Sequence, residues 1–233
     1  MKHLRHILLL FLCASMSAGS AGWAAGGMTE VTYMDQEATG GGYVTRYLVT
    51  ERYLRLDYGR DREDFVLFDR KERRAYNISH ERQEVLVFEP GIVQVKPPKK
   101  WEIKEDFFEN RGERKRLDLV VNGTVCTRLA ATEQFLPEVA QALQEFHTLM
   151  AATHSGTYLT TPEEQRDDCD LARLILDPQR WFKYGMPYDE LRSNGFSRRL
   201  LNYQVDVPVR PTALEVPAAY RLIRFNQLPG ATQ

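Results

Sequence analysis

The chain has 233 residues, and 31 Lys and Arg side chains are balanced by 32 Asp and Glu, which gives a formal net charge of −1 at pH 7. This balance argues against the concentrated basic surface with which proteins grip a nucleic-acid backbone. A chain of this length can bury a sizeable core within one domain.

The first 24 residues (1–24) have the pattern of a secretory signal peptide. Lys2 and Arg5 give a positive start, Ile7–Cys13 is a short apolar run, and small residues follow it. The run is far shorter than the roughly 20 residues that a membrane-spanning helix needs. We therefore expect cleavage after Ala24, with Ala21 as the second choice, and an exported, periplasmic protein that does not span the membrane.

Residues 25–233 are predicted to form a single β-rich domain that begins with an antiparallel meander. Between residues 53 and 58, Leu54, Leu56 and Tyr58 share one face, which is the period of a half-buried strand. Predicted strands recur about every ten residues, with polar turns between them. These strands are Tyr43–Thr50, Tyr53–Tyr58, Asp64–Phe68, Ala75–Ile78, Glu84–Phe88, Trp101–Lys104, Leu117–Val121 and Thr124–Leu129.

The clearest turn signal is Asn122–Gly123, between the last two of these strands. Asn-Gly is the strongest two-residue signal for a type I′ turn, because both central residues need positive φ. We expect a tight hairpin at this position.

After the hairpin, the apolar period changes from that of a strand to that of a helix. The apolar face of this predicted helix comprises Leu136, Val139, Ala140, Leu143, Phe146 and Met150. A second helix is indicated where Thr161 can cap and Pro162 can take the first helical position. It continues with a break and stops before Pro178, so a helical insertion is expected over about 136–178.

Strand character returns towards the end of the chain. Ser197–Val209 alternates between polar and apolar residues, and Arg221–Phe225 forms a short final run. These segments are predicted to close the sheet.

Cysteine usage points to one structural disulfide. Cys13 lies in the predicted signal peptide, and the even pair that remains in an exported chain is typical of a disulfide. Cys126 and Cys169 lie 43 positions apart, and closing a loop of that size stabilises a fold by about 4 kcal/mol. Redox-active and zinc-binding pairs use C-x-x-C spacing, which this pair lacks. The bridge would fasten the helical insertion to the hairpin.

Two short motifs resemble those of a known family. Gly123–Cys126 resembles its G-x-x-C strand, and Leu214–Tyr220 resembles its closing phrase, in which Leu or an aromatic residue is followed by P-x-x-Y. With the order of elements, they are similar to an uncharacterised bacterial periplasmic family built on the lipoprotein-carrier half-barrel, the type of LolA and the RseB N-terminal domain. The resemblance implies an α+β fold, with a strongly curved antiparallel β-sheet whose concave face is covered by the helical insertion.

Such a sheet cannot fill its own hollow, so either helices or an acyl chain must fill it. The candidate lining residues are Leu54, Leu56, Tyr58, Leu143, Phe146 and Met150. The alternative interpretation is that the helix fills the hollow and that these residues are core.

Motifs for catalysis and for metal binding are missing from the sequence. His80, His147 and His154 have no partner at a metal-binding spacing such as H-E-x-x-H. Asp167–Asp170 does not match a calcium loop, and neither a nucleophile elbow nor a phosphate-binding loop occurs. We expect no enzyme, no cofactor and no metal site.

The favoured hypothesis is a non-catalytic exported binding protein that shields an acyl chain or a lipoprotein in the periplasm. The alternative is a structural or interaction subunit of a cell-envelope protein complex, for which Tyr43, Tyr47 and Tyr53 would supply exposed aromatic strands. Nucleic acid is not expected as a partner of either.

Overall fold

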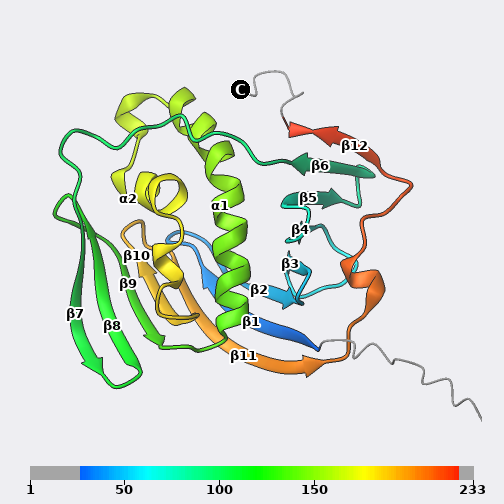
Figure 1. The fold of residues 1–233 in the computed structure, drawn as a ribbon, viewed down its shortest axis with the longest axis horizontal. Coiled ribbons are helices and arrows are strands. Elements are labelled where there is room, and N and C mark those ends of the chain that lie inside the picture. Colours follow the sequence, from blue (N-terminus) through cyan, green and yellow to red (C-terminus); the bar gives the residue numbers. More distant parts are fainter. Residues whose placement is uncertain (1–26, 226–233) are drawn as a thin grey trace, which may run out of the picture.

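Strands with alternating burial make up most of the fold (Figure 1). The computed structural model describes residues 27–225, so the predicted signal peptide and the residues from Asn226 onward lie outside it. Within the described range, all twelve strands belong to one sheet, in the order β12-β6-β5-β4-β3-β2-β1-β11-β10-β9-β8-β7. The strands are β1 (Met28–Gln36), β2 (Gly42–Val49), β3 (Tyr53–Asp57), β4 (Phe65–Asp69), β5 (Arg74–Ser79), β6 (Glu84–Phe88), β7 (Ile103–Arg111), β8 (Arg114–Val121), β9 (Thr124–Thr132), β10 (Pro187–Arg192), β11 (Ser197–Val207) and β12 (Arg221–Arg224).

The predicted hairpin between β8 and β9 is confirmed. Its two turn residues, Asn122 and Gly123, have φ values of 49° and 86°, the positive φ that a type I′ turn requires. Residues Val121 and Thr124 then pair across the two strands. The local sequence therefore fixes the register of this hairpin.

One long helix, α1 (Pro137–Thr160), lies across one face of the sheet (Figure 1). It starts at the proline that suits a first helical turn and continues past Met150. Its apolar face forms a core with side chains from β1 to β5. The buried members of this core are Val31, Tyr33, Tyr47, Val49, Leu54, Phe68, Ala75, Leu136, Val139, Ala140, Ala142, Leu143, Leu149 and Met186.

The predicted helical insertion over residues 136–178 is wrong beyond α1. After Thr160 the chain forms only short turns: Glu163–Gln165, α2 (Asp168–Asp170) and a π-helical stretch, Leu171–Leu176. Pro162 prevents α1 from continuing, because proline has no N–H and forces the preceding residue to be extended. Thr161 is extended accordingly, with φ −72° and ψ 133°. A helical layer covering a concave sheet is therefore not formed by this segment.

The predicted antiparallel half-barrel is also wrong. The sheet is mixed, because β12 pairs in parallel with β6, from Arg221 opposite Glu84 to Arg224 opposite Val87. Its two edge strands, β12 and β7, do not pair with each other, so the sheet stays open. Parallel pairing arises because the chain crosses the other face of the sheet before it reaches β6.

That crossing segment, residues 208–220, is called the C-terminal strap here. Leu214 on the strap is 7% exposed and packs with Phe65 and Leu67 of β4, on the face opposite α1. Residues of β2 to β6 are thus buried on both faces. Burial on both sides explains why Arg55 of β3, on the face opposite Leu54, is 1% exposed.

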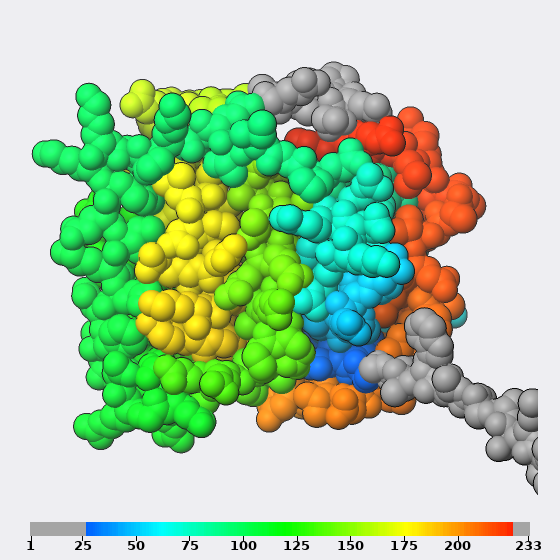
Figure 2. Space-filling model, viewed as in Figure 1, coloured from blue at the N-terminus to red at the C-terminus, as the bar shows by residue number. Residues whose placement is uncertain are grey.

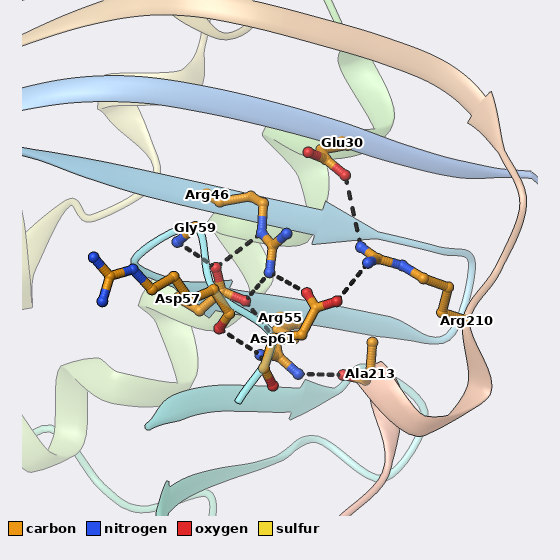
Figure 3. A network of polar contacts seen from close by, with 9 residues as sticks. Glu30, Arg46, Arg55, Asp57, Gly59, Asp61, Arg210 and Ala213 are labelled. Atoms are coloured by element: carbon orange, nitrogen blue, oxygen red, sulfur yellow. Dashed lines mark hydrogen bonds and ion pairs between the residues drawn. The ribbon is translucent and has the colours of Figure 1, made fainter. Parts of the chain in front are cut away.

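The charged groups beneath the strap form a network of ion pairs and hydrogen bonds (Figure 3). Arg55 donates from Nε to Asp57 at 2.6 Å and from Nη1 to the carbonyl oxygen of Ala213 at 2.9 Å. Arg46 donates to Asp57 at 2.9 and 2.7 Å and to Asp61 at 2.6 Å. Buried charges are tolerated when they are paired and hydrogen-bonded, so this network has a structural role, joining the sheet to the strap.

Candidate functional site

The predicted lining residues are mostly core residues. Leu54 and Leu143 are 2% and 3% exposed and belong to the core between α1 and the sheet. Leu56, Phe146 and Met150 pack against the same core. Figure 2 shows atoms of α1 and of residues 161–186 filling the space between β7–β9 and β2–β4.

Two tyrosines do not have the exposure that the sequence predicts. Tyr58 follows the last residue of β3 and is 60% exposed, with its ring edge-on to Tyr43 at 6.0 Å. Tyr47, expected on an exposed strand, is 3% exposed in the core. The structure therefore brings five of the six lining candidates together and separates Tyr58 from them.

Two open spaces border α1. One, of about 600 Å³, lies beside its first half and has charged walls that include Arg70 and Glu145. The other lies further along the helix, next to β6. A groove of about 440 Å³, called the α1 groove here, runs between the second half of α1 and the chain that follows β6. Its lining comprises Val87, Phe88, Glu89, Pro90, Gly91, Ile92, Gln94, Ala152, Thr153, Gly156 and Phe225. Most of these side chains are apolar or small.

Small residues on α1 allow the neighbouring chain to approach. Ser155 is fully buried, and its Oγ accepts hydrogen bonds from the backbone N–H groups of Gln94 and Val95 at 2.9 and 3.1 Å. A Cβ placed on Gly91 would lie 3.0 Å from the Cβ of Ala152. The loop after β6 is thus held against the helix by a hydroxyl group and a close contact, which keeps the groove in shape.

The groove has mostly apolar walls, and among the described residues Glu89 is the one charged residue in its lining. Phe88 stacks on Phe225 with ring centroids 5.2 Å apart, and Ile92 is 84% exposed. Exposed apolar side chains around a hollow mark binding surfaces. The same loop continues into the exposed Lys96, Lys99 and Lys100.

Sequence reasoning missed the α1 groove because its apolar residues follow no period. The basic cluster at Lys96–Lys100 and the small residues of the helix, Ala152, Ser155 and Gly156, were the only signals. A run of small residues on one side of a helix indicates close approach of another chain, but not which chain.

The predicted disulfide is confirmed by the structure. The Sγ atoms of Cys126 and Cys169 are 1.95 Å apart, and they join β9 to α2. Leu119 and Trp181 pack around the pair in a second core cluster, over β7–β9. A bonded pair agrees with an exported chain, because disulfides persist in oxidising compartments.

In the range 27–225, no three His, Cys, Asp or Glu side chains are placed to hold a metal ion. His80 contacts Tyr220, with Nδ1 2.7 Å from the phenol oxygen, and His147 packs against Phe182.

Over the same range, no helix is both long enough and apolar enough to cross a membrane.

Comparison with known proteins gives no family. No protein-family model and no curated protein matches the chain. Among solved structures, an uncharacterized conserved protein from Thermus thermophilus has 8% identity and a TM-score of 0.41, with 85% of this chain and 91% of that one covered. PNGF-II in two crystal forms has 8% identity and TM-scores of 0.41 and 0.42, and the match spans 31% of its length. At these scores the likeness carries no argument about function.

Proposed function

We propose that the chain is a non-catalytic exported protein of the periplasm that binds an acyl chain, free or attached to a lipoprotein, in the α1 groove. The observation that carries the proposal is the groove of about 440 Å³ with the stacked Phe88 and Phe225 and the exposed Ile92 on its walls. The larger hollow beside the first half of α1 is lined by charged and polar side chains apart from Phe68, so it suits an acyl chain less well than the α1 groove does.

The energetics favour a chain over a compact ligand. Each methylene removed from water contributes about 0.8 kcal/mol, so a hydrocarbon tail laid along apolar walls gains affinity with length. An anionic head would lie towards Lys96, Lys99 and Lys100, where Coulomb attraction at the surface is modest and sensitive to salt.

A fluorescent fatty acid tests the proposal by titration into the purified protein. We expect saturable binding that Thr153→Trp weakens at least about tenfold, because the indole would occupy the groove. Thr157→Trp is the matched control on the same helix, at an exposed position outside the groove. Equal binding by Thr153→Trp and the wild type, with both folded, would contradict the proposal.

The part that Lys96, Lys99 and Lys100 play in binding has its own experiment. Replacing the three lysines by glutamine should weaken a fatty acid but leave a neutral monoacylglycerol unaffected. Equal losses for both ligands would show that the lysines act through the fold and not through the head group.

A further inference from the structure

A second cavity lies between α1, the chain from Leu171 to Pro187, and strands β1, β10 and β11. Its volume is about 40 Å³, which corresponds to about three water-sized volumes. Its polar lining is Tyr33, His147, Arg173, Glu190, Arg192 and Arg198. It is called the arginine cavity here, and it shares no lining residue with the α1 groove.

Arg198 is a fixed wall of the arginine cavity. Its Nε and Nη2 donate to the two carboxylate oxygens of Asp35 at 2.7 and 2.5 Å, and Nη1 donates to the phenol oxygen of Tyr47 at 2.6 Å. Asp35 is 1% exposed. Each nitrogen of this guanidinium group therefore donates to a group of the protein. Arg198 contributes positive charge and shape to the wall of the cavity.

Arg173 and Arg192 are only partly satisfied. Arg192 donates from Nε to Glu190 at 2.6 Å and stacks on Phe196 at 4.0 Å, and Arg173 donates from Nη2 to Asp170 at 2.8 Å. Among residues 27–225, no acceptor meets the N–H groups of Nη1 and Nη2 of Arg192, or those of Nε and Nη1 of Arg173. The side chains of Arg173 and Arg192 are 18% and 19% exposed, so these N–H groups reach solvent and can exchange water for an incoming charged acceptor.

The walls of the arginine cavity carry more cations than anions, while Asp35 and Asp170 pair with two of the cations from outside the lining. Three guanidinium groups and one carboxylate, Glu190, line it. Burial, and next the neighbouring Arg173, lower the pKa of His147 to about 3. Burial, and next the charge of Arg192, lower the pKa of Arg173. A neutral imidazole between repelling cations can donate a hydrogen bond without adding to the repulsion.

We propose that Arg173 and Arg192 bind the carboxylate group of a small organic acid in the arginine cavity. Two guanidinium groups on different elements, with free N–H groups, match the two oxygens of a carboxylate, since such charge-assisted bonds are the strong ones. The volume admits an acid of the size of formate or acetate. The proposal does not depend on acyl-chain binding in the α1 groove.

Isothermal titration with acetate tests this, with acetamide as the neutral probe of the same shape. We expect acetate to bind and acetamide not to bind. Arg173→Gln should weaken acetate at least about tenfold, since a hydrogen bond to a charged group contributes about 1.5–3 kcal/mol. Asp170, the partner of Arg173, has a half-exposed side chain, so this variant leaves no buried charge unpaired and should fold.

Two further variants complete the test. Arg199→Gln is the matched control, because Arg199 follows Arg198 on β11, is exposed and lines no part of the cavity. Arg192→Lys keeps the charge beside Glu190 but removes the fork, and should weaken acetate as well. The proposal is overturned if acetate fails to bind the wild type, or if folded Arg173→Gln and Arg192→Lys bind it as the wild type does.

Discussion

Among single residues, His147 links burial to acid sensitivity. It projects from α1 and packs against Phe182, and its pKa falls from 6.5 to about 3, first through burial and then through Arg173. His154, further along the same helix, also has a lowered pKa, first through burial. Both side chains are therefore neutral in the folded protein at pH values where the unfolded chain takes up protons.

The sign of the pH effect follows from the lowered pKa of His147. Below pH 6.5 the unfolded chain binds a proton that the folded protein refuses, so the free energy of unfolding decreases as the pH falls. The slope approaches about 1.4 kcal/mol per pH unit for one such group. We expect His147→Gln to flatten the fall between about pH 6.5 and 5, and the variant that also carries His154→Gln to flatten it further.

Urea denaturation at a series of pH values measures this effect. The window lies above the ordinary pKa values of 3.8 for Asp and 4.5 for Glu, so carboxylates contribute little there. If the free energy of unfolding falls with pH as steeply in His147→Gln as in the wild type, His147 is not the group that folding holds neutral.

At the scale of elements, local signals predicted what local interactions decide. Asn122–Gly123 specified its hairpin because its backbone preference needs no other part of the chain, and the change of apolar period at Leu136 marked the start of α1. The strand β10 was missed, since Asp189, Glu190 and Arg192 give it no apolar alternation. Its place is determined by pairing with β9 and β11, which are distant in sequence.

The candidate site was predicted less well than the elements, for a physical reason. Periodicity identifies residues that face a core, and Leu54 and Leu143 do so. Whether a core position lines an empty hollow depends on what the opposite element inserts, and α1 fills the space with its own side chains. Arg173 and Arg192 belong to segments that only the tertiary fold brings together.

The disulfide supports a prediction for the irregular segment after α1. Residues 163–176 have only short helical turns, so their position depends on Cys169 and on packing against Trp181. We expect Cys126→Ala/Cys169→Ala to lower the free energy of unfolding by about 4 kcal/mol. Amide exchange should rise most in Leu171–Leu176, and the reduced wild type should behave like the variant.

If amide exchange in Leu171–Leu176 is the same in the double-alanine variant as in the wild type, this account is contradicted. Such a result would mean that the apolar contacts of Leu171 and Ala172, which are buried, hold the segment without the bond.

At the scale of the whole molecule, one sheet connects several hydrophobic clusters. The core beneath the C-terminal strap contains Leu214 with β4 to β6, whereas Trp181 and Trp101 belong to the cluster over β7–β9. The parallel strand β12 and the strap could not be predicted from the local sequence pattern. Arg221–Arg224 pairs with Glu84–Val87, which is distant in sequence. Backbone pairing continues without a break through β1 and β11. We therefore expect the half of the sheet beneath the strap and the half formed by β7–β9 to unfold together.

Leu214→Ala tests that cooperativity. Removing a buried leucine side chain costs about 2–5 kcal/mol, and Leu222→Ala is the matched control, because Leu222 on β12 is 63% exposed and should cost less than about 0.5 kcal/mol. Tryptophan fluorescence reports the distant half, where Trp101 and Trp181 lie, while far-UV circular dichroism reports the whole sheet. If the sheet unfolds as one unit, both transitions shift together to lower urea in Leu214→Ala. A fluorescence transition that stays at the wild-type midpoint while the dichroism shifts would show two halves that unfold independently.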